Sequence, residues 1–303
     1  MQKERLKGVI AASVTAFTSE RDIDTAAMER LTKYYLNSGL AGALINSSTG
    51  EYFSMTTGQR EKSVRAAVKA AEGKLLIMAG ISEDHITGAI EMGKLMADCG
   101  ADIAAAMPPR FFTYSEDELF SFFTSIADAL PIPLLVYNHM TRLNNKLSVD
   151  LICRLSQHPN ICGVKDTHND ASRLMTLLER VKDRDDFVVY AGGDAMAGFS
   201  ALMGGSMLNA LCAVAPKLFI ELQKAGEAGN VSKVMTLQQR VNKLMGLNNL
   251  IVRPGGSSMS AFYQSIKAAL KTNELCSTDT AQMGFDISDE EIGKIKEFIA
   301  DFE

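Results

Sequence analysis

Residues 8–17 have the sequence GVIAASVTAF, which is apolar almost without interruption. A run of this length without polar alternation is typical of a strand that is buried on both faces, as in a parallel sheet. The run is not followed by a Gly-x-Gly-x-x-Gly turn, so the dinucleotide-binding type of open sheet loses its best support. The opening stretch therefore indicates a parallel α/β protein without that nucleotide site.

Seven further apolar segments of strand length follow it, at residues 41–47, 74–81, 101–107, 133–138, 161–165, 187–191 and 207–213. Amphipathic segments typical of helices lie between and after them, at residues 25–38, 57–71, 84–98, 115–129, 148–156, 171–181, 195–203 and 215–228. Such an alternation fits either an open doubly wound sheet or a closed barrel. The count of eight favours the barrel, and we predict the α/β class with a (β/α)8 TIM barrel.

The last part of the chain has a different pattern. Helical segments are expected at residues 231–248, 258–271 and 289–302, with Pro254-Gly255-Gly256 interrupting the first two. No linker separates them from the strand–helix units. We therefore expect residues 1–228 to form the barrel and residues 229–303 to form a C-terminal helical extension packed on it.

Composition limits the classes of function. The chain has 303 residues, of which 47% are hydrophobic, and a formal net charge of −5. A nucleic-acid surface needs a basic stripe, which is absent here. Five widely spaced cysteines argue against a disulfide framework or a structural zinc site and favour a reducing cytoplasm. The polar start at residues 1–8 lacks an apolar signal segment, and no stretch is long enough to span a bilayer. We expect a cytoplasmic protein with a small-molecule partner, no nucleic acid and no membrane.

The carboxyl ends of barrel strands carry the catalytic groups, and Lys165 stands at one of them. A lysine inside an apolar strand is costly unless it is paired or neutral. A neutral amine condenses with a ketone to a Schiff base, whose iminium withdraws electrons from an adjacent bond. The plain alternative is a lysine that lies past the strand end, solvated or paired with Asp166.

Two other strand ends supply partners for that amine. Tyr137 ends the segment 133–138, and its phenol is suited to move protons during carbinolamine formation. Ser48 and Thr49 follow the segment 41–47, where hydroxyls and backbone amides at the entry to a helix suit a carboxylate. The alternatives are a core tyrosine with a buried hydrogen bond and an ordinary loop.

These strand ends together resemble the dihydrodipicolinate synthase / N-acetylneuraminate lyase family of class I aldolases. The resemblance covers residues 8–228 and rests on Ser47-Ser48-Thr49-Gly50-Glu51, Tyr137-Asn138, Gly163-Val164-Lys165-Asp166 and Gly204-Gly205. It implies a barrel, commonly a homotetramer, that binds pyruvate or a pyruvate-derived acid as an imine without a cofactor.

The resemblance also implies roles for single residues. It makes Lys165 the Schiff-base lysine and Tyr137 the proton relay, and it assigns the keto-acid carboxylate to Ser48 and Thr49. Two further positions carry over: Asn209, whose backbone carbonyl would face the pyruvyl group, and Arg142, which would receive a carboxylate of the second substrate.

Departures from the family pattern count against two of the activities found in the family. Phe111 stands where synthases usually place a tyrosine that completes a hydroxyl relay across a subunit interface, and phenylalanine transfers no proton. The Tyr-Asn-x-Pro pattern is replaced by His139 and Met140 after Tyr137-Asn138. Both changes count against dihydrodipicolinate formation. Sialic acid lyases fit no better, since they have Asp-Glu where this chain has Asp194-Ala195.

Thr167 and Asp194 are available to bind the hydroxyls of a sugar acid, so we expect an aldolase or dehydratase that acts on a 2-keto-3-deoxy acid. His139, His168 and Phe111 are further pocket candidates, and the two histidines are considered as acid/base groups or anion contacts. Two rival interpretations stay open. One is a metal-dependent barrel aldolase that uses His139, Asp166, His168 and Asp194; the other is a non-catalytic relative that binds a keto acid.

Overall fold

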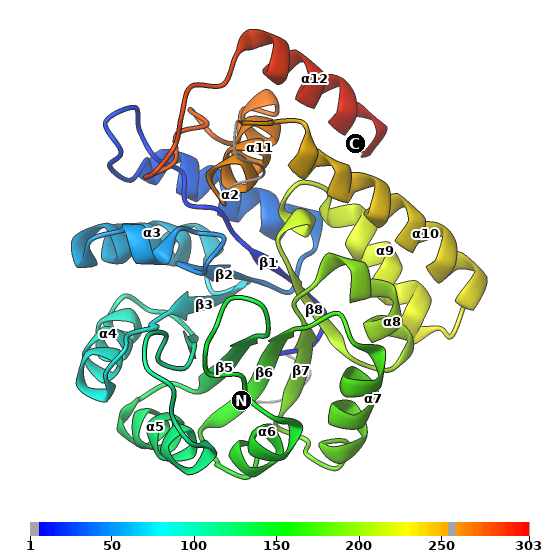
Figure 1. The fold of residues 1–303 in the computed structure, drawn as a ribbon. Helices are drawn as coiled ribbons and strands as arrows, with labels where there is room; N and C mark the ends of the chain where they lie inside the picture. Colours follow the sequence, from blue (N-terminus) through cyan, green and yellow to red (C-terminus); the bar gives the residue numbers. More distant parts are fainter. Residues whose placement is uncertain (1–5, 254–258, 303) are drawn as a thin grey trace.

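The structure, a computed structural model, describes residues 6–253 and 259–302. Its centre is a closed barrel of parallel strands in the order β1 to β8, with β1 pairing β8 (Figure 1). The strands are β1 Val9–Ala12, β2 Gly42–Ile45, β3 Leu76–Gly80, β4 Ile103–Ala106, β5 Leu134–His139, β6 Ile161–Thr167, β7 Val188–Ala191 and β8 Ser206–Asn209. The prediction of a (β/α)8 barrel is confirmed.

Helices surround the barrel as an outer ring (Figure 1). They are α2 Thr25–Ser38, α3 Thr57–Ala71, α4 Ile86–Asp98, α5 Glu116–Ala129, α6 Val149–Leu155, α7 Ala171–Arg180, α8 Ala197–Leu202 and α9 Pro216–Glu227. Capping residues fix several starts. Thr56 and Ser115 form capping boxes with Gln59 and Glu118, which satisfy amide groups that have no partner inside the helix.

The first and last strands are shorter than the apolar runs predicted. The run at residues 8–17 is a strand only to Ala12, and the run at residues 207–213 leaves the sheet after Asn209 to form the short helix η3, Leu211–Ala213. The apolar character continues because loop residues such as Val14 and Phe17 are themselves buried in the core. Hydrophobicity marks burial and does not mark where pairing ends.

The C-terminal helices are α10 Val231–Leu244, α11 Met259–Thr272 and α12 Asp289–Ile299, with short helical turns at η4 Met245–Asn249 and η5 Ala300–Phe302. Helix α10 packs against α8 and α9 on the barrel (Figure 1). The predicted interruption at Pro254-Gly255-Gly256 lies outside the described residues. Within the described residues, no helix is long and apolar enough to cross a membrane.

Two apolar layers result from the alternation of side chains along each strand. One set fills the barrel interior and includes Ile10, Leu44, Met78, Leu135 and Leu208. The other packs between the sheet and the helices. At the carboxyl ends of the strands, interior positions therefore point into the mouth of the barrel, where side chains from different strands meet.

Candidate active site

Lys165 lies on β6, directly between two tyrosines of the neighbouring strands. Its backbone is in register with Tyr137 of β5 and Tyr190 of β7. Lys165 is only 3% exposed, and its Nζ lies 4.3 Å from the centroid of the Tyr137 ring. The amine is therefore withdrawn from solvent and held against the phenol, and the structure brings together the two residues that sequence analysis placed at the centre of the chemistry.

Gly192, which directly follows β7, leaves the space that these side chains occupy. A Cβ atom at this position would lie 2.1 Å from Thr167 Oγ1 and 3.1 Å from Lys165 Cε. Any larger residue would displace the lysine or the threonine from the mouth of the barrel. The glycine after β7 is thus a steric requirement of the site.

The Tyr137 phenol is tied to the turn that follows β2. Its hydroxyl lies 3.1 Å from Ser48 Oγ, at hydrogen-bond distance. Burial raises the pKa of Tyr137, but a positive charge at Lys165 and the Ser48 hydrogen bond outweigh it, so the pKa lies below its ordinary value. A phenol of lowered pKa beside an amine is suited to take the ammonium proton and leave a nucleophilic amine.

A cavity of about 420 Å³ opens above these residues. Nine of the predicted site residues line it: Ser48, Thr49, Tyr137, His139, Arg142, Lys165, Thr167, His168 and Asp194. They come from the ends of four strands, β2, β5, β6 and β7, and from the loops that follow them, so only closure of the barrel places them together. The cavity is of the size that holds a small organic substrate.

Two titratable side chains in the cavity have shifted pKa values. Burial raises the pKa of Asp194 to about 6, against the lowering effects of the Leu211 amide and Lys165. Burial, with the charges of Arg142 and Lys165, lowers the pKa of His139 to about 4. At neutral pH the site therefore contains a carboxylate close to its protonation range and a neutral imidazole.

Buried polar atoms in the same cavity lack partners within the chain. Thr167 Oγ1 and His168 Nδ1 are both buried without a hydrogen bond to any described residue. An unpaired buried polar group is costly, and such groups cluster where a ligand supplies the missing partner. They mark the part of the cavity beside Lys165 as suited to hydroxyl groups.

Residues 5–298 match the family model described as the dihydrodipicolinate synthetase family. The chain belongs to that family. It is therefore an enzyme of a lyase family, and the resemblance inferred from the strand ends is confirmed.

Relatives in the family include a 4-hydroxy-tetrahydrodipicolinate synthase of Methylobacterium radiotolerans, 30% identical over 80% of each chain. Another, from Roseobacter denitrificans, is 30% identical over 94% of each chain. Among solved structures, a dihydrodipicolinate synthase of Bacteroides thetaiotaomicron is 25% identical, with a TM-score of 0.89 over 98% of both chains. YagE of E. coli K12, a family protein solved in complex with pyruvate, is 21% identical, with a TM-score of 0.88 over 98% of both chains.

Two of the residues that carry the family resemblance point away from the cavity. Asn138 and Asp166 follow Tyr137 and Lys165 on their strands, so their side chains face the helix layer. Asp166 accepts hydrogen bonds from Asn138 Nδ2 at 2.9 Å and from Arg173 Nε at 2.8 Å. This pair joins β5 and β6 beside the cavity and supports the register of Tyr137 with Lys165. Asp166 is engaged with Asn138 and Arg173, which makes it unavailable to the rival metal site.

Within residues 6–253 and 259–302, no group of three or more histidine, cysteine, aspartate and glutamate side chains is arranged to hold a metal ion. The side chains of two other predicted residues also lie outside the cavity, although the prediction for Asn209 concerned its backbone carbonyl. The Asn209 side chain is fully buried outside it, with both amide atoms unpaired among described residues. Phe111 lies on an exposed loop after β4 and is 77% exposed, so it does not line the cavity of its own chain.

A smaller cavity of about 260 Å³ adjoins the site and shares Ser48, His139 and Arg142 with it. Its remaining lining includes Glu51, which forms a buried ion pair with Lys267 of α11. Lys267 was not among the residues predicted from the sequence. Its signal was present, since a lysine between Ile266 and Ala268 on an apolar helix face needs a buried partner.

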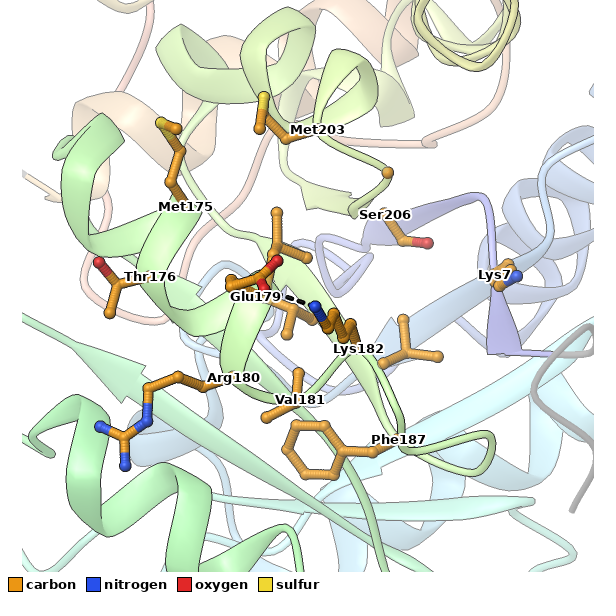
Figure 2. A pocket seen from close by; sticks show the side chains of 14 residues that line it. Lys7, Met175, Thr176, Glu179, Arg180, Val181, Lys182, Phe187, Met203 and Ser206 are labelled. Carbon is orange, nitrogen blue, oxygen red and sulfur yellow. Dashed lines mark hydrogen bonds and ion pairs between the residues drawn. The ribbon is translucent and has the colours of Figure 1, made fainter.

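A cavity of about 620 Å³, larger than the one described above, lies at the opposite end of the barrel, where Lys7 and Phe187 precede β1 and β7 and Ser206 begins β8 (Figure 2). Two of its polar side chains, Glu179 and Lys182, form an ion pair with each other at the surface (Figure 2). Active sites of this fold occur at the other end of the strands. Size alone therefore does not identify the functional cavity here.

Proposed function

We propose that the chain is a class I aldolase or dehydratase that forms a Schiff base between Lys165 and pyruvate or a 2-keto-3-deoxy acid. The observation that carries the proposal is the buried Lys165 amine held 4.3 Å from the Tyr137 ring at the floor of a polar cavity. Burial and an adjacent proton carrier are the two conditions that make a lysine a nucleophile.

Imine formation follows from this arrangement. The Lys165 amine attacks the keto carbon, and the carbinolamine loses water after proton transfers through the Tyr137 hydroxyl. Ser48 Oγ, 3.1 Å from that hydroxyl, continues the relay. Ser48 and Thr49 hold the carboxylate of the keto acid through hydroxyl and backbone N–H groups, and the Asn209 carbonyl faces the pyruvyl group.

The iminium then acts as an electron sink. The Tyr137 oxygen takes the proton of the C4 hydroxyl, the C3–C4 bond breaks, and its electron pair passes through C3 into the iminium to give an enamine. C4 leaves as the carbon of an aldehyde. Thr167 and Asp194 bind the hydroxyls of the acceptor portion, and Arg142 receives a carboxylate there. His139 and His168 line this portion of the pocket. No metal or organic cofactor enters the scheme.

Dihydrodipicolinate formation is not the activity that we propose, although several relatives are named synthases. Phe111 occupies the place of the relay tyrosine and transfers no proton, and Met140, directly after β5, stands in the place of the family's proline. A polyhydroxylated acid instead matches the unpaired Thr167 and His168 atoms.

We further propose a cytoplasmic homotetramer, with residues 1–228 as the barrel and 229–303 as its extension. Phe111 and Phe112 are 77% and 65% exposed on neighbouring positions of one loop, which is costly for a monomer. The five cysteines are free, in keeping with a reducing compartment.

Borohydride reduction in the presence of pyruvate tests the function. The wild type is expected to gain a pyruvyl mass on Lys165, and Lys165→Ala is expected to gain none. An adduct on Lys165→Ala at the wild-type rate refutes the assignment. Loss of turnover on adding a chelator, with no adduct, supports the metal alternative, and binding without turnover across a panel of aldol donors and acceptors supports the non-catalytic one.

A further inference from the structure

A buried ion pair joins the C-terminal helices to the turn after β2. The side chains of Lys267 and Glu51 are 0% and 2% exposed. Lys267 Nζ donates to Glu51 Oε1 and, at 2.7 Å, to the carbonyl of Thr280. The other carboxylate oxygen, Glu51 Oε2, accepts from the backbone N–H of Gln282 at 2.8 Å. Both oxygens of one residue in the turn are thus held by a distant part of the chain.

Stability alone does not account for such a pair. Removing two charges from water costs several kcal/mol per ion, and replacement of a buried pair by apolar side chains of similar volume is often neutral or stabilising. The position of Glu51 in the chain gives a different reason, because it directly follows the turn that presents Ser48 and Thr49 to the cavity.

Glu51 closes that turn in an unfavourable backbone conformation. Its φ is 59°, in the left-handed region that residues other than glycine seldom adopt. In this conformation its N–H donates to the Ser48 carbonyl at 3.2 Å, and the next amide, of Tyr52, donates to the Ser47 carbonyl at 3.2 Å. The contacts to the carboxylate hold the residue where these hydrogen bonds form.

The barrel fixes the other side of the same turn. Thr15 Oγ1 donates to the Gly50 carbonyl at 2.7 Å. A Cβ atom on Gly50 would lie 3.1 Å from the Ser13 carbonyl oxygen and 3.2 Å from Thr15 Oγ1, so the backbone is packed closely against β1 and its loop. The turn is therefore held on one side by its contacts with Ser13 and Thr15 and on the other by the hydrogen bonds of the Glu51 carboxylate.

We propose that Lys267 is a positioning residue for the keto-acid carboxylate. It does not line the cavity, but through Glu51 it sets the hydroxyl and N–H groups of Ser48 and Thr49, and with them the Ser48 contact to Tyr137. The inference rests on the proposed Schiff-base function. It makes the C-terminal helices part of the substrate-binding site, because they supply the cation that shapes it.

Two variants test it: Lys267→Met, and the double variant Lys267→Met with Glu51→Met, in which an apolar pair replaces the ions. The readouts are the pyruvate concentration that half-saturates borohydride trapping and the midpoint of thermal unfolding. We expect both variants to need about tenfold to a hundredfold more pyruvate, since small misplacements of binding groups have effects of this order. At saturating pyruvate the adduct on Lys165 is still expected.

The double variant separates positioning from a purely structural role. A structural role predicts that restored stability also restores the wild-type half-saturating concentration, and that result overturns the proposal. Glu51→Gln keeps the shape of the pair and removes its charge. It covers the case in which the methionine variants do not fold, and we expect about a threefold or larger increase in half-saturating pyruvate.

Lys271→Met is the matched control. Lys271 lies one turn further along α11 and pairs with Asp279 at 3.1 Å, away from the turn after β2. We expect its half-saturating concentration to equal that of the wild type. Folded variants at Lys267 and Glu51 that bind pyruvate like the wild type overturn the inference alone, whereas absence of any adduct on the wild type overturns the proposed function.

Discussion

Replacing Tyr137 by phenylalanine separates the chemistry of the phenol from its packing. The ring, and with it the 4.3 Å contact to Lys165 Nζ, is kept. The substitution removes one hydroxyl and its 3.1 Å hydrogen bond to Ser48. A hydrogen bond of this kind contributes about 1 kcal/mol to folding, which is a small part of the roughly 5–15 kcal/mol that stabilises a typical domain. The variant is therefore expected to fold.

The effect on imine formation is much larger. Loss of a positioned proton carrier slows a step by about 10²–10⁴-fold, which corresponds to about 2.7–5.4 kcal/mol of activation free energy. The assay is the initial rate at which borohydride traps the pyruvyl adduct, followed by intact mass, with thermal unfolding measured on the same sample. The expected result is a rate at least a hundredfold below that of the wild type.

Tyr190→Phe is the control on the neighbouring strand. Tyr190 is in register with Lys165, but its hydroxyl donates to the Leu6 carbonyl towards the other end of the barrel. Its loss is expected to lower the unfolding midpoint and leave the trapping rate unchanged. A Tyr137→Phe rate within a few-fold of the wild type, or an equal slowing by Tyr190→Phe, would show that the phenol is not the relay.

Four further outcomes are expected. Arg142→Ala should raise the Michaelis constant of an acidic second substrate and leave pyruvate trapping unchanged; unchanged Michaelis constants for every substrate remove the assignment. Asp194 has a pKa raised to about 6 by burial, so its ionisation destabilises the folded state as pH rises through that value. Asp194→Asn should therefore melt above the wild type at about pH 8 and level with it near pH 4. Burial lowers the pKa of His139 to about 4. Protonation of His139 therefore destabilises the folded state as pH falls from 6.5 to about 4. His139→Gln should show a flatter unfolding profile in this window. Phe111→Ser should reduce the assembly mass in sedimentation if the exposed phenylalanine lies between subunits.

The fold was predictable from the sequence because each apolar run and each amphipathic segment is a local signal. Local signals also predicted the position of the candidate catalytic residues, as the segment around Lys165 illustrates. A lysine at the end of an apolar strand, and a tyrosine at the end of the preceding one, meet in any parallel barrel, since neighbouring strands end at the same rim. The prediction of strand ends was less accurate. The apolar run at residues 8–17 extends beyond the end of β1 at Ala12 because the loop residues that follow are also buried.

The sequence by itself therefore predicted the barrel, and it placed Lys165, Tyr137, Ser48 and Thr49 at strand ends, all of which depend on patterns within short segments. Only the tertiary structure decided which of these side chains share a cavity. It showed that the side chains of Asn209 and Phe111 lie outside that cavity and that Lys267 reaches Glu51 across 216 positions of the chain. The reason is physical. Periodicity reports which face of a segment is buried, whereas the partner of a buried charge depends on how distant segments pack, and no local pattern encodes that contact.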